Sequence, residues 1–412
     1  MSFYSEKKNL YLSRYAWQGS CFEDYSTHVP PEMIIVIPSY KETTLLSTLQ
    51  SIYACDLPDS TTEVLIIINQ PEDESEENEA INLCSYRETL KWSEAHSTER
   101  LKFLPVYVRD LPKKYAGVGL ARKIGMDEAI KRFGNYENGI IINIDADTTC
   151  EPDYLLEIAT YFKTNPKSPG CSIYFEHPLD SMAITEYELF LRYYSHGLKY
   201  AGFPFYFQTV GSAFAVRASS YLIQGGMNKR KAGEDFYFLH KIFSLGNFGT
   251  LTKTTLHPSS RMSDRVPFGT GRAMLEYDEI TGFMTYDFST FMDLKQLFDA
   301  LPTLFSNQGN VDSLLLSPVL QEYLLLINFE NEVKKITMRS SSYPIFSKHF
   351  FNWFNGFAIM KYCNWSREHH YTPLPVQQAV MQYRKQINAP LESGSSPGEL
   401  LKILRDEDNG RG

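Results

Sequence analysis

Two aspartates, Asp145 and Asp147, follow directly after the apolar run of residues 139–144. A run rich in β-branched residues predicts a strand buried on both faces of a parallel sheet. Side chains two positions apart on a strand point to the same side, so both carboxylates can face one site beyond the strand. Such a pair suits a hard divalent cation, whose shell water and phosphate oxygens complete. The alternative is a loop pair that caps a helix starting near Pro152, and the preceding strand favours the metal interpretation.

A second acidic pair, Glu234 and Asp235, follows Gly233 at the start of a predicted helix over residues 234–243. Acidic residues in the first turn of a helix commonly do no more than complement its dipole. In the functional interpretation, one of the two is a general base that takes the proton of an acceptor hydroxyl. The residue pattern alone leaves both interpretations open.

Positive charge gathers in residues 261–272, which contain Arg261, Arg265 and Arg272 together with two glycines. Guanidinium forks and exposed backbone amides match phosphate oxygens in geometry, although a solvated loop is the ordinary role of such a stretch. His257 precedes it as an isolated histidine. A lone histidine is usually structural, yet it would suit a metal that needs one more donor.

The elements that must position these residues are visible as alternating strand and helix patterns. Buried strands are predicted at residues 33–37, 64–68, 101–108 and 139–144, with helices at 45–54 and 120–133. This order indicates an α/β fold, an open and mainly parallel sheet with helices on both faces, in which ligands lie beyond the carboxyl ends of the strands. We expect an N-terminal extension at 1–30, a sheet domain at 31–273 with halves 31–150 and 151–273, and a mainly helical region at 274–412 with a flexible tail from about 390.

Composition narrows the possible functions. The chain has 412 residues and a net charge of −9, which argues against a nucleic-acid partner. A bound diphosphate would therefore need local positive charge, from Arg122 and Lys123 or from the arginines of 261–272. The first residues lack the apolar core of a signal peptide, no apolar run is long enough to be a transmembrane segment, and the six cysteines include no CxxC pair. We expect a cytoplasmic protein with free thiols, and peripheral membrane contact and the oligomeric state stay open.

Three common enzyme signatures lack support in the sequence. It contains no GxxxxGK[ST] phosphate loop and no strand-borne GxGxxG, and its GxSxG match, residues 394–398 (GSSPG), follows no predicted strand and so is not a nucleophile elbow. The ATPase, nicotinamide dehydrogenase and serine hydrolase interpretations therefore lose their usual support.

Taken in chain order, the remaining segments resemble glycosyltransferase family 2, which has the nucleotide-binding GT-A fold. Residues 35–42 (IVIPSYKE) are similar to the family's IPxYNE opening, 119–125 (GLARKIG) to its GxxxARNxG helix, and 145–152 (DADTTCEP) to its DADxxxxP segment. Residues 211–217 (GSAFAVR) resemble the acceptor-side segment, and Gly225-Gly226 and then the Glu234-Asp235 pair follow. The resemblance covers about residues 32–245.

The resemblance implies a role for each matching residue. Asp147 would ligate Mg²⁺ or Mn²⁺ on the diphosphate, Asp145 would touch the ribose and metal-bound water, and Asp235, with Glu234 beside it, would be the base. His257 matches a position at which some relatives supply another metal ligand. The other donor-binding residues would be Pro38, Tyr40, Glu42, Asn69, Arg122, Arg261, Arg265 and Arg272, and Gly211 and Ser212 would bind the acceptor.

The sequence departs from the family pattern at two places. Asn69-Gln70 replaces the usual acidic pair, for which Asp73 is a weak substitute, and Lys123 replaces an asparagine.

The expected function is that of a metal-dependent, inverting glycosyltransferase of the hexosyltransferase type. It would move a sugar from a nucleotide-diphosphate donor to a hydroxyl of a carbohydrate or other acceptor. A sugar-nucleotide pyrophosphorylase is one alternative, but residues 38–42 are not the glycine-rich basic loop that it needs. The other is a degenerate GT-A protein that acts as a non-catalytic binding or scaffold subunit. Intact Asp145, Asp147 and Asp235 argue against that alternative, while Asn69-Gln70 keeps it open.

Overall fold

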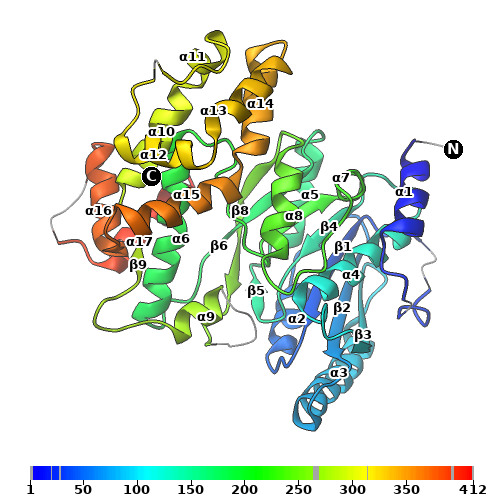
Figure 1. Cartoon of the computed structure of the whole chain (residues 1–412). Helices are drawn as coiled ribbons and strands as arrows, with labels where there is room; N and C mark the ends of the chain where they lie inside the picture. The colour runs from blue at the N-terminus through cyan, green and yellow to red at the C-terminus, as the bar shows by residue number, and fades with distance from the viewer. Residues whose placement is uncertain are drawn as a thin grey trace. The chain divides into compact units, whose positions relative to one another are not determined.

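An eight-stranded sheet is the framework of the first of two units in the computed structural model, which describes residues 3–19, 21–26, 29–262, 269–312, 314–390 and 394–410. This first unit comprises Met1–Pro178 and Thr209–Arg272, and the second comprises Leu179–Gln208 and Ala273–Gly412 (Figure 1). Residues 179–208 thus pack with the C-terminal part of the chain. The expected domain boundaries at 31, 150 and 273 stay a prediction.

The sheet has the order β3-β2-β1-β4-β7-β6-β8-β5. Its strands are β1 (Met33–Ser39), β2 (Thr62–Pro71), β3 (Leu101–Leu111), β4 (Ile140–Asn143), β5 (Thr148–Cys150), β6 (Gly170–Phe175), β7 (Phe214–Arg217) and β8 (Gly249–Pro258). The first four strands are parallel neighbours, as are β6 and β8, whereas β7 and β5 run antiparallel to their neighbours. The predicted α/β class with a mainly parallel sheet is confirmed.

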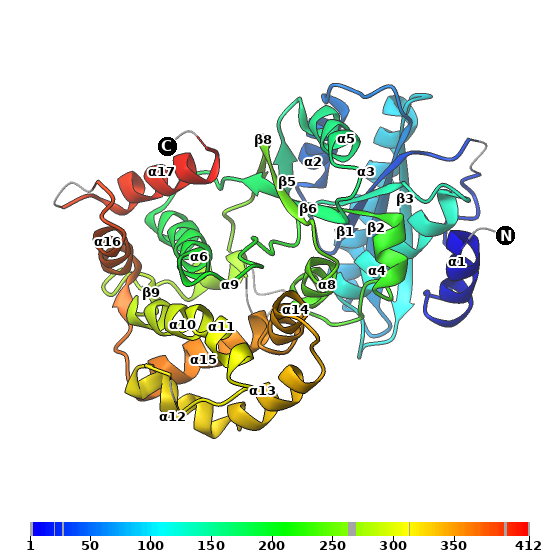
Figure 2. The same cartoon turned by 90° about the horizontal axis from the view of Figure 1, so that it is seen from above.

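Helices cover the sheet of the first unit (Figure 2). They are α1 (Phe3–Arg14), α2 (Leu45–Tyr53), α3 (Glu76–His96), α4 (Val118–Arg132), α5 (Tyr154–Thr164), α7 (Ala218–Ile223) and α8 (Glu234–Phe243). The approach of α4 to the sheet depends on Gly125, because a Cβ there would lie 2.5 Å from Cγ1 of Val36 and 2.7 Å from Cδ1 of Ile67. Glycine therefore brings this helix close to β1 and β2.

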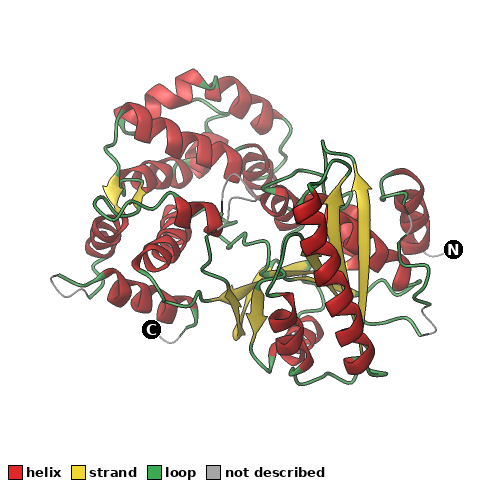
Figure 3. Cartoon of the chain, turned by 90° about the horizontal axis from the view of Figure 1, so that it is seen from below, coloured by secondary structure: helices red, strands yellow, loops and turns green. Residues whose placement is uncertain are grey.

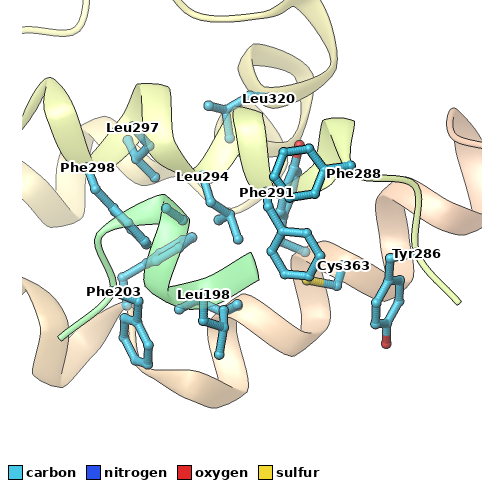
Figure 4. Close-up of a cluster of buried hydrophobic side chains, with 14 of the residues drawn as sticks. Leu198, Phe203, Tyr286, Phe288, Phe291, Leu294, Leu297, Phe298, Leu320 and Cys363 are labelled. Atoms are coloured by element: carbon cyan, nitrogen blue, oxygen red, sulfur yellow. The ribbon is translucent and has the colours of Figure 1, made fainter. Parts of the chain in front are cut away.

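The second unit is mainly helical, as predicted (Figure 3). Its helices are α6 (Met182–Ala201), α10 (Ser289–Asp299), α11 (Leu301–Ser306), α12 (Pro318–Leu326), α13 (Phe329–Met338), α14 (Tyr343–Trp353), α15 (Gly356–His369), α16 (Val376–Gln386) and α17 (Pro397–Asp408), and β9 (Met284–Thr285) pairs with β10 (Leu374–Pro375). Helix α9 (Thr270–Leu275) spans the change from one unit to the other. Leu198, Phe203, Phe291 and Leu294 belong to an aromatic and aliphatic core (Figure 4).

The C-terminal helix differs from the expected flexible tail. Leu400, Leu401 and Leu404 of α17 are fully buried in the core of the second unit. Its Arg405 pairs with the buried Glu188 of α6 at 2.7 Å. A capping box formed by Ser396 and Glu399 starts the helix. The sequence of residues 390–396 obscured this packing because its turn-forming composition is also typical of a disordered segment. None of the helices in the described ranges has the length and apolarity needed to cross a bilayer.

Candidate active site

The polar residues of interest leave the sheet where β1 and β4 end side by side. Val36 of β1 is paired with Asn143 of β4, so Asp145 emerges just past the position where β1 continues to Pro38. The turn after β1 holds Lys41 in the left-handed region, with φ of 51°. This conformation costs a non-glycine residue energy, and its backbone N–H donates to Oδ1 of Asn82 at 2.8 Å. A constrained turn thus places Glu42 beyond β1.

Arg122 joins two of the predicted site carboxylates and lies near a third. This residue of α4 is almost fully buried and donates to Asp145 and to Glu234. A Cβ at Gly211 would lie 2.5 Å from Nη2 of Arg122 and 2.8 Å from Oδ2 of Asp235. The guanidinium and the Asp235 carboxylate therefore both reach the space beside Gly211.

The protonation of this cluster follows from burial opposed by charge. Burial raises the pKa of Glu234 to about 7, against the opposing effect of Arg122. Burial also raises the pKa of Asp235, and Arg122 again opposes the change. For Arg122, burial lowers the pKa, but the charges of Asp145 and Glu234 outweigh burial and the pKa lies above its ordinary value. The guanidinium stays charged, while the two carboxyls of α8 bind protons more readily than exposed ones.

Arg261 forms the second cluster, immediately after β8. Its Nη1 donates to Oε1 of the buried Glu42 at 2.8 Å, and its Nη2 lies 2.9 Å from Oδ2 of Asp147. Burial and the charge of Asp145 raise the pKa of Asp147 to about 6, although Arg261 opposes them. The structure thus brings Glu42, Asp147 and Arg261 together, and their role in donor binding stays a prediction.

Helix α2 fixes the segment that carries the aspartate pair. The hydroxyl of Thr48 donates to the carbonyl oxygen of Ala146 at 3.0 Å, and the backbone N–H of Cys150 donates to the hydroxyl of Ser51 at 3.2 Å. The N–H of Asp56, just after the helix, donates to the carbonyl oxygen of Pro152 at 2.7 Å. Sequence reasoning missed Thr48 and Ser51. Their three-residue spacing placed them on one face of the helix, but nothing linked that face to residues 146–150.

The charge balance of the site favours a cation. In the described part of the site, five carboxylates lie around the guanidiniums of Arg122 and Arg261, namely those of Glu42, Asp145, Asp147, Glu234 and Asp235. Two carboxylates two residues apart fit Mg²⁺ or Mn²⁺ when water and phosphate oxygens supply the other ligands. Among the described residues, no group of three or more His, Cys, Asp or Glu side chains is placed to hold a metal ion. The metal role of Asp145 and Asp147 therefore stays a prediction that depends on ligands from a bound diphosphate and water.

Several predicted residues lie apart from the two clusters. Nε2 of His257 lies 2.9 Å from Oε1 of Glu151, and Nδ1 lies 3.3 Å from the carbonyl oxygen of Glu176, so both ring nitrogens are engaged away from Asp147. The metal role of His257 stays a prediction, and the hydrogen bonds of its ring to Glu151 and Glu176 do not support it. Asp73 pairs with exposed Lys113 at 2.5 Å and does not replace a missing site carboxylate. Arg272 lies in α9, and Arg265 lies outside the described residues.

The expected nucleoside side of the site lies at the ends of β1 and β2. Pro38 is paired with Ile67 in the sheet, and the Tyr40 hydroxyl donates to Glu74. Asn69 and Gln70 are buried at the end of β2, where Gln70 accepts a hydrogen bond from the Tyr107 hydroxyl. Ser212, beside Gly211, is buried just before β7. The site thus has an amide-rich edge at β2 in place of an acidic one.

Replacing Arg122 by Met is expected to destabilise the first unit by about 3–5 kcal/mol at pH 8, because Glu234 would keep a buried charge without its partner. The loss should shrink towards pH 6, where Glu234 takes up a proton. Urea unfolding curves at the two pH values would measure it. Arg109→Met is the matched control, since Arg109 pairs with Glu79 at an exposed position and should cost at most about 1 kcal/mol. Equal losses in both variants would contradict the buried-pair argument.

A mainly parallel sheet with acidic and basic side chains at the carboxyl ends of its strands is the arrangement that the sequence resemblance predicts. Residues 34–220 match the model of the family described as Glycosyl transferase family 2. The matched segment contains Glu42, Arg122, Asp145 and Asp147, whereas Glu234, Asp235 and Arg261 lie beyond it.

Solved structures with similar folds include two glycosyltransferase-like chains. Residues 1–349 of S. aureus TarS in complex with UDP-GlcNAc are 14% identical, with 92% of this chain and 89% of that chain covered and a TM-score of 0.39. The mannosyltransferase PcManGT from Pyrobaculum calidifontis, in complex with GDP-Man and Mn²⁺, is 12% identical, with 98% and 95% covered and a TM-score of 0.39. No curated protein sequence matches the chain.

Proposed function

We propose that the protein is a metal-dependent, inverting glycosyltransferase that moves a hexose from a nucleotide-diphosphate donor to an acceptor hydroxyl. The observation that carries the proposal is the Arg122 cluster, which joins the donor-side Asp145 to the acceptor-side pair Glu234 and Asp235. The Arg122 guanidinium thereby connects a residue on the leaving-group side of the reaction with the residues on the acceptor side. The match of residues 34–220 to the model of glycosyl transferase family 2 supports the same reaction class.

The residues divide between the leaving group and the acceptor. Asp145 and Asp147 would hold Mg²⁺ or Mn²⁺, which would stabilise the charge that grows on the departing nucleoside diphosphate. Arg261 lies beside Asp147 and would donate hydrogen bonds to phosphate oxygens of the departing nucleoside diphosphate. Such contacts accelerate the reaction because the leaving group is more negative in the transition state than in the donor.

Asp235 would act as the base on the opposite side of the sugar. The acceptor oxygen forms a bond to the anomeric carbon as the bond from that carbon to the diphosphate breaks, and the acceptor proton passes to the Asp235 carboxylate. Asp235 is only partly buried, whereas Glu234 is buried and bonded to Arg122. Asp235 can therefore reach an acceptor, and Glu234 would hold Arg122 in place.

We also propose a cytoplasmic location. All six cysteines are unpaired, including Cys55 and Cys150, whose sulfur atoms lie 3.6 Å apart. Unpaired thiols at this distance fit a reducing compartment. Fractionation of cells that make the full chain would test the location.

A panel of nucleotides and nucleotide-sugars, each with and without Mn²⁺, would test the function. We expect one nucleoside class to raise the midpoint of thermal unfolding only with Mn²⁺, and its sugar form to be slowly hydrolysed to the nucleoside diphosphate. Stabilisation without turnover of any donor would instead support a non-catalytic binding subunit. Formation of a nucleotide-sugar from sugar phosphate and nucleoside triphosphate would support a pyrophosphorylase.

A further inference from the structure

Outside the two clusters, Asp127 of α4 is the carboxylate with the most partners in the first unit's interior. The hydroxyls of Tyr11 and Tyr221 donate to its Oδ1 at 2.6 and 2.7 Å. Its Oδ2 accepts from the backbone N–H of Trp17 at 2.7 Å and lies 3.0 Å from Nζ of Lys123. The carboxylate is 1% exposed. Three separate segments, the N-terminal one, α4 and α7, thus meet at one buried charge.

Tyr11 also sets the path of the chain after α7. A Cβ at Gly226 would lie 1.9 Å from the Tyr11 hydroxyl oxygen, and Gly226 has φ of 73°. Only glycine fits at this close approach, so the Tyr11 ring determines where the segment turns. That segment continues through Asn228, whose side-chain amide donates to the carbonyl oxygen of Glu234 at 3.0 Å. The segment that packs against Tyr11 therefore also contacts the start of α8.

The same segment packs against the start of α4. A Cβ at Gly119 would lie 2.0 Å from the carbonyl oxygen of Arg230 and 3.0 Å from Cβ of Glu234. Arg122 is one turn further along α4, and Lys123 directly follows it and donates to the Tyr11 hydroxyl at 2.9 Å. Figures 1 and 2 both show α1 beside α4. Arg122 thus lies on the helix that meets the N-terminal segment and α7 at Asp127, and Glu234 lies at the end of the segment that follows α7.

We propose that Tyr11 is a positioning residue for the active site: through Asp127 and Gly226 it fixes α4 against residues 225–235, so that Arg122 meets Glu234 and Asp235. Tyr11 precedes the segment that matches the family model, which begins at residue 34. Tyr11 and Tyr221, which both donate to Asp127, thus lie outside the matched range 34–220. Its catalytic consequence rests on the proposed function, while its structural part does not.

Tyr11→Phe tests the proposal, since it removes the hydroxyl and keeps the ring. If Arg122 moves away from the carboxylates, the pKa of the base rises, and the acidic limb of the pH profile of kcat/KM shifts to higher pH. An opposite charge commonly lowers a carboxyl pKa by about 1–3 units, so partial loss should shift the limb by about 0.5–1 unit. On the acidic limb of the profile, kcat/KM would then fall about 3- to 10-fold, with little change on the plateau at higher pH. Tyr15→Phe, at an exposed position of the same N-terminal segment, is the control.

Amide hydrogen exchange provides a readout that needs no turnover. We expect faster exchange in residues 227–237 of Tyr11→Phe but not of Tyr15→Phe, and this result would hold even if the transferase activity were absent. If Tyr11→Phe does not fold, Tyr221→Phe removes the other hydroxyl on Oδ1 of Asp127 and should give the same two effects. An unchanged pH profile together with unchanged exchange would overturn the proposal. A uniform loss of activity at every pH would overturn its positioning role.

Discussion

Asp235→Asn is expected to lower kcat by a factor of about 10²–10⁴, the range that general-base catalysis commonly contributes. The amide has nearly the same shape as the carboxylate but cannot take the acceptor proton. Arg122 should keep its hydrogen bonds to Asp145 and Glu234 in this variant. Donor affinity should therefore change little. Steady-state kinetics with the donor found by the nucleotide-sugar panel would measure both quantities.

Glu234→Gln is the matched companion variant, because it alters the neighbouring carboxylate on the same helix. Its main expected effect is on the pH profile: Arg122 would lose one of two partners and act more strongly on Asp235, so the acidic limb should move to lower pH. In the wild type, protonation of the base as pH falls removes activity, and the raised pKa of Asp235 places this loss above the range of an exposed aspartate. Wild-type transfer by Asp235→Asn would refute the base assignment.

Asp147→Asn is expected to abolish the contribution of Mn²⁺ to donor binding. Residues that merely orient a metal ligand typically cost 10–100-fold in metal affinity when replaced, so loss of a ligand should cost at least about 100-fold. Isothermal titration of nucleoside diphosphate with and without Mn²⁺ would measure the difference. In the wild type the Mn²⁺ effect should also weaken below about pH 6, because Asp147 is then protonated. Equal affinity of variant and wild type with Mn²⁺ would contradict the metal role.

The stability of the metal-free protein shows whether Asp147→Asn acts locally. The pKa of Asp147 is raised in the folded state, so its ionisation costs stability as pH rises through about 6. Removing the charge should therefore leave the variant at least as stable as the wild type at pH 8. Glu151→Gln, at the far end of the same strand segment, is the control. If the control lost a comparable part of the Mn²⁺ contribution to donor affinity, the metal would instead be bound near Glu151 and His257.

The strands of the sheet were predictable because burial on both faces leaves a direct trace in the sequence. The runs that became β1, β2 and β4 contain almost only β-branched and aliphatic residues, and the residues that follow them carry the site. The pairs at Asp145 and Asp147 and at Glu234 and Asp235 were identified for the same reason, since each lies at the end or start of a recognisable element. Local periodicity thus defines much of the site.

The partners of these residues were not predictable from local pattern. Arg122 meets Glu234 across 112 positions of the chain, and Arg261 meets Glu42 across 219. Thr48 and Ser51 are ordinary polar residues of a helix until the fold brings Ala146 and Cys150 to them. His257 shows the opposite difficulty. Its residue type suits a metal ligand, but in the fold its imidazole is hydrogen-bonded to Glu151. Pairings at such distances depend on the tertiary fold and leave no periodic signal in the sequence.

The order of the strands has a consequence for how the protein matures. β4 and β5 are consecutive in the chain, yet β7, β6 and β8 stand between them in the sheet. A nascent chain that has produced both aspartates still lacks β8, the strand to which β5 is hydrogen-bonded, and it also lacks Arg261. Long-range pairing of this kind forms late in folding. The segment 34–220, produced alone, would lack β8, Arg261 and the Glu234-Asp235 pair, and the contacts from α2 would remain to hold the Asp145–Asp147 loop. Donor binding should therefore require residues beyond the segment that carries most of the motifs.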